Sequence, residues 1–480
     1  MSGKMKSFGL VLVGVVAGVL LSLNLSAVAQ RELVRSPLPY EDLRTFSEVF
    51  GRIKSDYVEP VEDKKLISEA ITGMLTGLDP HSAYLDQDAF KELQVGTQGE
   101  FGGLGIEVGM EDGFVKVVSP IEDTPAFRAG LKPGDLIVKI DDTPTKGMTL
   151  NDAVKKMRGA PKTSIRLTIL RKGESKTFDV TLVRDRIRVQ SVKSKVIEPG
   201  YGYVRLSQFQ EHTVENLVKH LNTLYKDGQL KGLVLDLRND PGGLLNGAVG
   251  VSAAFLPANA LVVSTDGRTP DARRKYVAAP EDYVRGRQED VLRNLPAAVK
   301  SVPMVVLVNT GSASASEIVA GALQDHKRAT IMGTQTFGKG SVQTILPLSN
   351  NTAIKLTTAR YYTPSGRSIQ AKGVTPDILI DEPGAPKDRV READLQRHLS
   401  GGEEKAGATP TDKPADKPAA KPEPAPAEDA KDQKPIELGG PDDFQLKQAI
   451  NHLKGLPVMT QIEQAKAEDK TPAKSEAKKN

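Results

Sequence analysis

The spacing of hydrophobic residues changes several times along the chain, and each change marks a predicted region. Between residues 38 and 95, apolar residues recur every three or four positions, as in Tyr40–Tyr57 and Lys64–Leu78. That period predicts amphipathic helices. Between residues 97 and 186 the period shortens to two, as in Phe114–Val118. Alternation of this kind predicts strands, and turn signals separate them, so we expect one small β-rich domain here.

A larger core is predicted between residues 187 and 385. The continuous apolar runs Gly232–Leu237 and Pro303–Val308 are typical of strands that are buried on both faces. Helical patterns follow them at Leu244–Phe255 and Ser316–Asp325. Alternation of strands and helices predicts an α/β fold, with parallel strands and helices on the faces of the sheet.

The two ends of the chain differ from the predicted domains. Residues 1–29 combine early lysines, an apolar stretch and a small-residue Ala-Val-Ala site, which predicts a signal peptide or signal anchor and a periplasmic protein. Residues 386–440 are rich in Pro, Ala, Lys and Glu and predict a disordered linker. An amphipathic helix is expected at 441–458, as a docking element, and a disordered polar tail at 459–480.

Composition excludes several kinds of chemistry. The 480 residues include no cysteine, so disulfides, thiolate metal sites and cysteine catalysis are excluded. The formal net charge of +4 gives no indication of nucleic-acid binding. No metal-ligand cluster or phosphate loop is visible, and no histidine pairs with a carboxylate by spacing. We therefore expect no metal, no cofactor and no Ser-His-Asp triad.

Ser314 is the first candidate catalytic residue. It follows the apolar run that ends at Val308 and precedes a helical pattern, so its hydroxyl would stand at a helix N-terminus. There the N–H of Ala315 could face a developing oxyanion while Ser314 attacks. An alternative stays open, because Ser314-Ala-Ser-Glu317 also has the spacing of a capping box.

Lys339 is the candidate partner of Ser314. It lies between Gly338 and Gly340, with Phe337 and Val342 as possible apolar walls. A desolvated lysine loses its preference for the charged form and can act as a base. Gln343, which follows in the chain, could orient the amine. The alternative interpretation is an exposed lysine in a glycine turn.

The segment from Asp236 to Leu244 is the third candidate. It reads Asp-Leu-Arg-Asn-Asp-Pro-Gly-Gly-Leu and lies between a buried strand and a helix, where α/β folds place their sites. Gly242 and Gly243 could donate a second N–H to an oxyanion. An ordinary Asn-Asp-Pro-Gly turn is the alternative.

Together these segments resemble the carboxy-terminal processing, or tail-specific, proteases, which are serine peptidases with a PDZ domain. The resemblance covers roughly residues 40–383. It rests on five stretches: Gly103–Ile106, Ala129–Asp135, Asp236–Leu244, Gly311–Ile318 and Thr336–Gln343. It implies a protease core of the crotonase and ClpP type with an inserted PDZ domain. It also implies Ser314 as nucleophile, Lys339 as base, Gln343 as its partner, and an oxyanion hole from Ala315 and Gly242 or Gly243.

A PDZ domain would bind the C-terminus of a protein or peptide substrate. In such domains the peptide adds as a strand, and its carboxylate sits in a nest of backbone N–H groups. The residues expected to form this site are Phe101, Gly102, Gly103, Leu104, Gly105 and Ile106.

These features predict an exported endopeptidase that cuts near protein C-termini. We also expect a homo-oligomer, with an adaptor protein and membrane association through the N-terminus as further candidates. A PDZ scaffold on an inactive protease fold and a latent protease that needs an adaptor remain alternatives.

Overall fold

In the computed structural model, defined structure covers residues 39–121, 123–174, 176–286, 289–381, 390–401 and 437–459. The predicted signal segment 1–29, most of the predicted linker and nearly all of the tail lie outside these residues. The chain divides into two units, Met1–Ile71 and Thr72–Asn480. Helix α2 (Tyr40–Asp56) belongs to the first, and α3 (Asp63–Thr76) begins there. Within the described ranges, no helix has the length and apolar character needed to cross a membrane.

The β-rich domain is an antiparallel sheet with two short helices. Its strands pair in the order β3 (Ile106–Glu111), β4 (Phe114–Pro120), β5 (Leu136–Ile140), β7 (Ser164–Leu170) and β8 (Phe178–Val183), and β6 (Thr143–Pro144) pairs with β5. Helices α5 (Pro125–Arg128) and α6 (Leu150–Met157) belong to the same domain. Alternate residues such as Val115, Val117, Ile165 and Leu167 point into its core. Because β3 pairs only with β4, it is an edge strand of this sheet.

The larger core is built on a six-stranded sheet, which confirms the α/β expectation. Its order is β10 (Val192–Glu198), β11 (Tyr201–Leu206), β12 (Gly232–Asp236), β15 (Met304–Val308), β16 (Thr330–Gly333) and β19 (Ile378–Leu379). Strand β10 is antiparallel to β11, and the other neighbours are parallel.

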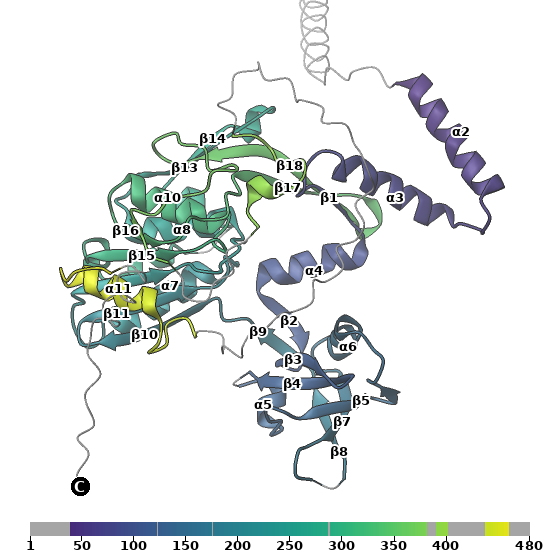
Figure 1. Cartoon of the computed structure of the whole chain (residues 1–480), viewed down its shortest axis with the longest axis horizontal. Coiled ribbons are helices and arrows are strands. Elements are labelled where there is room, and N and C mark those ends of the chain that lie inside the picture. Colours follow the sequence, from purple (N-terminus) through teal and green to yellow (C-terminus); the bar gives the residue numbers. More distant parts are fainter. Residues whose placement is uncertain are drawn as a thin grey trace, which may run out of the picture. The chain divides into compact units, whose positions relative to one another are not determined.

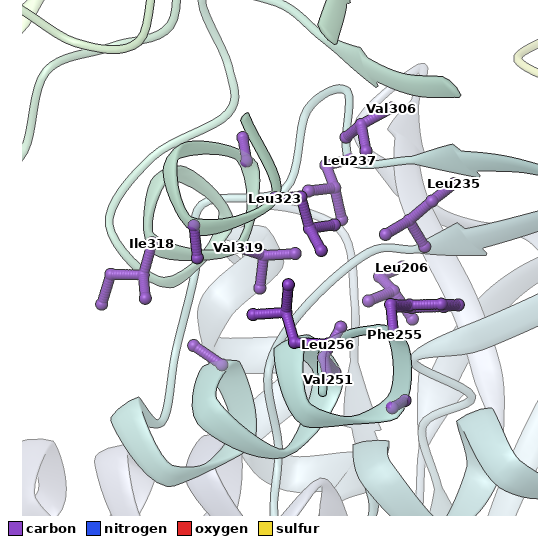
Figure 2. Packing of buried hydrophobic residues seen from close by; sticks show 14 of the residues in the cluster. Leu206, Leu235, Leu237, Val251, Phe255, Leu256, Val306, Ile318, Val319 and Leu323 are labelled. Atoms are coloured by element: carbon purple, nitrogen blue, oxygen red, sulfur yellow. The ribbon is translucent and has the colours of Figure 1, made fainter. Parts of the chain in front are cut away.

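Helices cover both faces of this sheet. Along β15, Val306 and Val308 join the cluster under α7 (Thr213–Leu224), α8 (Leu245–Phe255) and α10 (Ala315–Asp325), and Figure 2 shows part of that packing. Val305 and Leu307 point to the opposite face and pack in a second cluster with α11 (Phe444–Leu453). A strand with both faces buried reads as a continuous apolar run, which is the pattern seen in the sequence.

Helix α11 was expected to be a docking element, and the structure shows where it docks. It lies against β12, β15 and β16 of its own chain (Figure 1). Its apolar face, formed by Phe444, Leu446, Ala449 and Ile450, is buried. That face is therefore occupied within the chain and is not free to bind an adaptor or a second subunit.

A second, antiparallel sheet is centred on β18 (Ala353–Tyr362). β18 pairs with β1 (Ala83–Leu85), β13 (Leu261–Gly267) and β17 (Ser341–Pro347), and β14 (Arg274–Val277) pairs with β13. Lys339 lies two residues before β17, whereas Ser314 follows β15 of the other sheet. The two candidate catalytic residues therefore come from different sheets.

The remaining elements were not predicted individually. They are α4 (Gln87–Gln98), α9 (Pro280–Tyr283), the β2–β9 pair (Glu100–Gly103 and Asp185–Arg188), and the short 3-10 helices Pro270–Ala272, Val291–Asn294, Ala297–Lys300, Ser349–Asn351 and Glu392–Asp394.

Candidate active site

Ser314 is the N-cap of α10 and has φ 56° and ψ −112°. A positive φ is uncommon for a residue with a side chain, so surrounding contacts must hold this conformation. Two serine hydroxyls of the loop do so. Ser312 Oγ donates to the Leu237 carbonyl over 2.8 Å, and Ser316 Oγ donates to the Asp240 carbonyl over 2.9 Å. The loop that carries Ser314 is thereby bound to the loop after β12.

The carboxylate of Glu317 joins the Ser314 and Lys339 segments. Its Oε2 accepts hydrogen bonds from the backbone N–H groups of Ser314 at 2.8 Å and Lys339 at 2.9 Å. Its Oε1 accepts from Gly338 N at 2.7 Å and from Thr336 Oγ1 at 2.5 Å. Glu317 is fully buried, and burial raises its pKa to about 7, although the four hydrogen bonds act to lower it. The capping interaction of Glu317 with Ser314 is thus present and also reaches the lysine segment.

The backbone around Lys339 is held on its other side as well. Gly340 N donates to Gln370 Oε1 over 2.9 Å, and the Tyr361 hydroxyl donates to the Lys339 carbonyl. Burial raises the pKa of Tyr361 well above its usual value, and the Ser314 side chain opposes that rise. Tyr361 therefore holds the Lys339 backbone and lies near Ser314.

The Lys339 amine is in an environment that disfavours its charged form. Burial lowers its pKa below the usual 10.5, and the positive charge of Lys355 lowers it further. The carboxylates of Glu392, Glu317 and Asp79 act in the opposite direction. The net direction is downward, as a lysine base requires. The expectation of an exposed lysine in a glycine turn does not fit this environment.

A histidine–carboxylate pair, His81 and Glu392, lies near Lys339 and was not predicted from the sequence. His81 Nε2 lies 2.8 Å from Glu392 Oε2, and Gln370 Nε2 donates to Glu392 Oε1 over 2.8 Å. Burial alone would raise the pKa of Glu392, but these hydrogen bonds lower it below its usual value. The pair was not visible because His81 and Glu392 are 311 residues apart. Residues 390–401 were also placed in the predicted linker, yet Glu392 is fully buried.

The glycine turn after β12 lies against the start of α10. Gly242 N donates to Asp240 Oδ1 over 2.8 Å, whereas the N–H groups of Gly243 and Ala315 have no acceptor among the described residues. A Cβ on Gly242 would lie 2.8 Å from Ala315 N and 2.9 Å from Ser314 Cβ. The absence of a side chain therefore keeps open the space in front of the Ala315 N–H.

Asp240 contributes a buried carboxyl group to this turn. Burial raises its pKa to about 7, and the hydrogen bond from Gly242 N opposes that rise. Its Oδ2 atom is buried and has no hydrogen-bond partner.

Gln343 lies in β17, close in sequence to Lys339. Its Nε2 donates to Ser341 Oγ over 3.0 Å and to Thr357 Oγ1 over 3.4 Å. Thr357 Oγ1 donates in turn to Asp79, one of the carboxylates that act on Lys339. The orienting contact between Gln343 and the amine is not among these hydrogen bonds and stays a prediction.

The predicted peptide site divides into two parts. Phe101, Gly102 and Gly103 belong to β2, which pairs with β9, and the Phe101 ring lies 4.9 Å from the Arg158 guanidinium. Gly102 and Gly103 therefore lie in a paired strand.

Leu104, Gly105 and Ile106 lead into the edge strand β3. The Leu104 side chain is buried in the domain core, and Gly105 has φ 74°. A Cβ on Gly105 would approach Thr124 to 2.3 Å. The N–H groups of Leu104 and Gly105 have no acceptor among the described residues. This part has the free backbone donors that a peptide carboxylate needs.

Family comparisons agree with the geometry. Residues 200–380 match the model of peptidase family S41, residues 102–182 that of the PDZ domain, and residues 22–89 that of the activating protease CtpB N-terminal domain. The chain is 48% identical over 401 residues to a carboxy-terminal-processing protease of Bartonella bacilliformis, a match that covers 81% of this chain and 88% of the relative. The chain belongs to the carboxy-terminal processing proteases of peptidase family S41.

Two further relatives are less similar to this chain. The carboxy-terminal processing protease CtpA of Bacillus subtilis is 33% identical over 399 residues, which cover 82% of this chain and 81% of that protein. A solved photosystem II D1 C-terminal processing protease is 33% identical, with a TM-score of 0.40, and the match covers 72% of this chain and 88% of that one. Membership of the family makes this chain a serine-type peptidase with a PDZ domain.

No group of three His, Cys, Asp or Glu side chains that could hold a metal ion occurs in the described part of this peptidase.

The shared carboxylate of Glu317 gives a first prediction. In Glu317→Gln, the amide nitrogen cannot accept a hydrogen bond, so two of the four donors lose their acceptor. We expect kcat to fall about 10- to 100-fold, because hydrogen bonds to a charged group contribute about 1.5–3 kcal/mol each. Steady-state cleavage assays measure this, with the exposed Glu215→Gln as control. Equal kcat values for the two variants would contradict the role of Glu317.

The open space at Gly242 gives a second prediction. In Gly242→Ala, the added methyl group would block the Ala315 N–H, and we expect at least a 100-fold loss of kcat/KM. Gly228→Ala is the matched control, because Gly228 also has a positive φ but nothing lies within 4 Å of its added Cβ. A comparable loss in both variants would assign the effect to backbone strain alone.

Proposed function

We propose that this protein is an exported serine endopeptidase with a Ser314–Lys339 dyad, which captures protein C-termini in its PDZ domain and cuts nearby. The observation that carries the dyad is the Oε2 atom of Glu317, which accepts hydrogen bonds from the backbone N–H of both residues. The hydrogen bond from the Tyr361 hydroxyl to the Lys339 carbonyl, close to Ser314, supports it further.

Each chemical step has a candidate group. Lys339 takes the proton from Ser314 Oγ, and the oxygen attacks the scissile carbonyl carbon. The N–H groups of Ala315 and Gly243 donate to the oxyanion that forms, since both lack other acceptors. Lys339 then gives the proton to the leaving amine. Water hydrolyses the acyl-enzyme, again with Lys339 as base.

The second oxyanion donor is assigned to Gly243 instead of Gly242. Both glycines were candidates from the sequence. The N–H of Gly242 already donates to the Asp240 carboxylate, and a donor that is engaged elsewhere cannot also stabilise the transition state. Gln343 is kept as a proposed partner of Lys339, and its hydrogen bond to Ser341 would have to be exchanged for it.

The PDZ domain would recognise the free carboxylate of the substrate. The peptide would add as a strand to the open edge of β3, and its carboxylate would accept hydrogen bonds from Leu104 and Gly105 N–H. Export to the periplasm rests on residues 1–29, whose composition is that of a signal peptide.

Paired substrates test both halves of the proposal. We expect the wild-type protein to cleave an unfolded substrate with a free C-terminus, whereas Ser314→Ala and Lys339→Ala are inactive. The same substrate with an amidated C-terminus should show a KM raised roughly tenfold or more and a similar kcat, because it lacks the carboxylate. The exposed Ser349→Ala and Lys447→Ala serve as controls. Equal cleavage by wild type and both dyad variants would reject the dyad, and equal KM values would reject capture of the carboxylate.

The lowered pKa of Lys339 predicts the pH dependence. The base must be neutral, so kcat/KM should rise with pH through an apparent pKa below 10.5. In Lys355→Met, a charge that lowers the Lys339 pKa is removed, so the midpoint should move to higher pH. The exposed Lys275→Met is the control. A profile that falls with rising pH, or a midpoint unmoved in Lys355→Met, is the contrary result.

A further inference from the structure

Arg238 is a buried cation beside the active site. It follows β12 in the segment that continues to the glycine turn, and its side chain is 1% exposed. Nε donates to Asp236 Oδ1 over 3.0 Å, and Nη2 donates to Asp236 Oδ2 over 2.7 Å. A guanidinium with this burial needs its remaining donors satisfied and its charge compensated.

The remaining donors of Arg238 are satisfied from the other end of the chain. Nη1 donates to Asp443 Oδ1 and to Gln445 Oε1, each over 2.9 Å, and Nη2 donates to Asp443 Oδ2 over 2.5 Å. Two bidentate carboxylates, Asp236 and Asp443, thus bind the arginine, and Asp443 lies 205 residues after Arg238 in the chain.

Asp443 is itself held in place as the N-cap of α11. Its Oδ1 accepts from Leu446 N over 3.0 Å, and its Oδ2 accepts from Gly439 N over 2.7 Å. Burial would raise the pKa of Asp443, but the hydrogen bonds and charge of Arg238 keep it below the usual value. The helix therefore presents a fixed carboxylate to Arg238, in addition to its apolar face.

The charge of the cluster depends on Asp443. Asp236 also accepts from the Tyr203 hydroxyl over 2.7 Å and lies 3.7 Å from Arg205. Two arginines and two aspartates balance each other. Without the Asp443 carboxylate, one positive charge of the cluster would be buried without a negative partner. Removing one partner of a buried ion pair in this way strongly destabilises the folded state.

Arg238 is connected to the oxyanion turn through a short run of backbone. Asn239, the next residue, has φ 55° and its N–H donates to Asn309 Oδ1 over 2.9 Å. Asp240 then accepts from Gly242 N and, through its carbonyl, from Ser316 Oγ. A displaced Arg238 would therefore disturb the turn that carries Gly243 and the loop that carries Ser314.

We propose that Asp443, at the N-terminus of α11, is a positioning residue of the active site that acts through Arg238 on the oxyanion turn. The effect on catalysis rests on the proposed function of Ser314, Ala315 and Gly243. Loss of the Asp443 carboxylate would lower catalysis without any change to Ser314 or Lys339.

The test compares two neighbouring aspartates in the full-length protein. Asp443→Asn removes the buried charge, and Asp442→Asn, at the adjacent exposed position, is the matched control. We expect kcat of Asp443→Asn to fall at least tenfold with KM little changed, measured well below the unfolding temperature. Asp443→Glu keeps the charge and should recover most of the lost kcat. A purely structural role would lower the unfolding temperature and leave kcat per folded molecule unchanged.

A second readout does not depend on proteolysis. Backbone hydrogen exchange at residues 239–243 should be faster in Asp443→Asn than in Asp442→Asn. Exchange and kcat that are the same in both variants overturn the proposal. A further outcome is that the wild-type protein cleaves no substrate, while exchange is still faster in Asp443→Asn than in Asp442→Asn. That result would reject the proposed function and leave the positioning role of Asp443 standing. If Asp443→Asn does not fold, Gln445→Met, which removes one acceptor of Arg238, should give a smaller change in the same direction, and no change would overturn the proposal.

Discussion

The site depends on one buried carboxylate that serves two segments at once. Glu317 accepts the N–H of Ser314 and the N–H of Lys339 on a single oxygen, and two further donors on the other. A buried carboxylate is costly unless its lone pairs are filled, so the position of all four donors is tightly constrained. The capping geometry of α10 and the approach of the lysine segment are therefore parts of the same arrangement.

This arrangement joins two sheets that differ in character. The parallel sheet brings Ser314 and the glycine turn to the carboxyl ends of β15 and β12, where α/β folds place their sites. The antiparallel sheet brings Lys339 to the start of β17. The two sheets share one apolar cluster, to which Val306 of β15 and Val263 of β13 both belong. The segments that carry Ser314 and Lys339 are joined, in addition, by buried polar groups. Such networks specify one arrangement when every member is satisfied.

Buried charges recur around the site and set its chemistry. Glu392 is fixed by His81 and Gln370 near the Lys339 amine, and Asp443 is fixed by Arg238, which precedes the glycine turn. In both cases a segment after the family-matched core supplies the carboxylate. The residues beyond position 380 thus contribute charges to the site as well as length to the chain.

Much of the framework could be predicted from the sequence. The apolar runs predicted β12 and β15, and the positions of Ser314, Lys339 and the two glycines follow from motifs in short stretches of chain. These features are local, because strand burial and turn chemistry are recorded in neighbouring residues. Helix α11 was also visible as an amphipathic pattern, but its partner was not.

The sequence by itself therefore determined the main strands, helices and glycine turns, and which residue types are available for catalysis. Only the tertiary structure decided that Gly242 N is engaged by Asp240 while Gly243 N is free, that Glu392 pairs with His81, and that Asp443 neutralises Arg238. The physical reason is that hydrogen bonds and ion pairs between distant segments form only when the packing of the apolar layers has brought them together. The sequence shows which hydrogen-bond donors and acceptors are present, and the tertiary structure determines which of them pair.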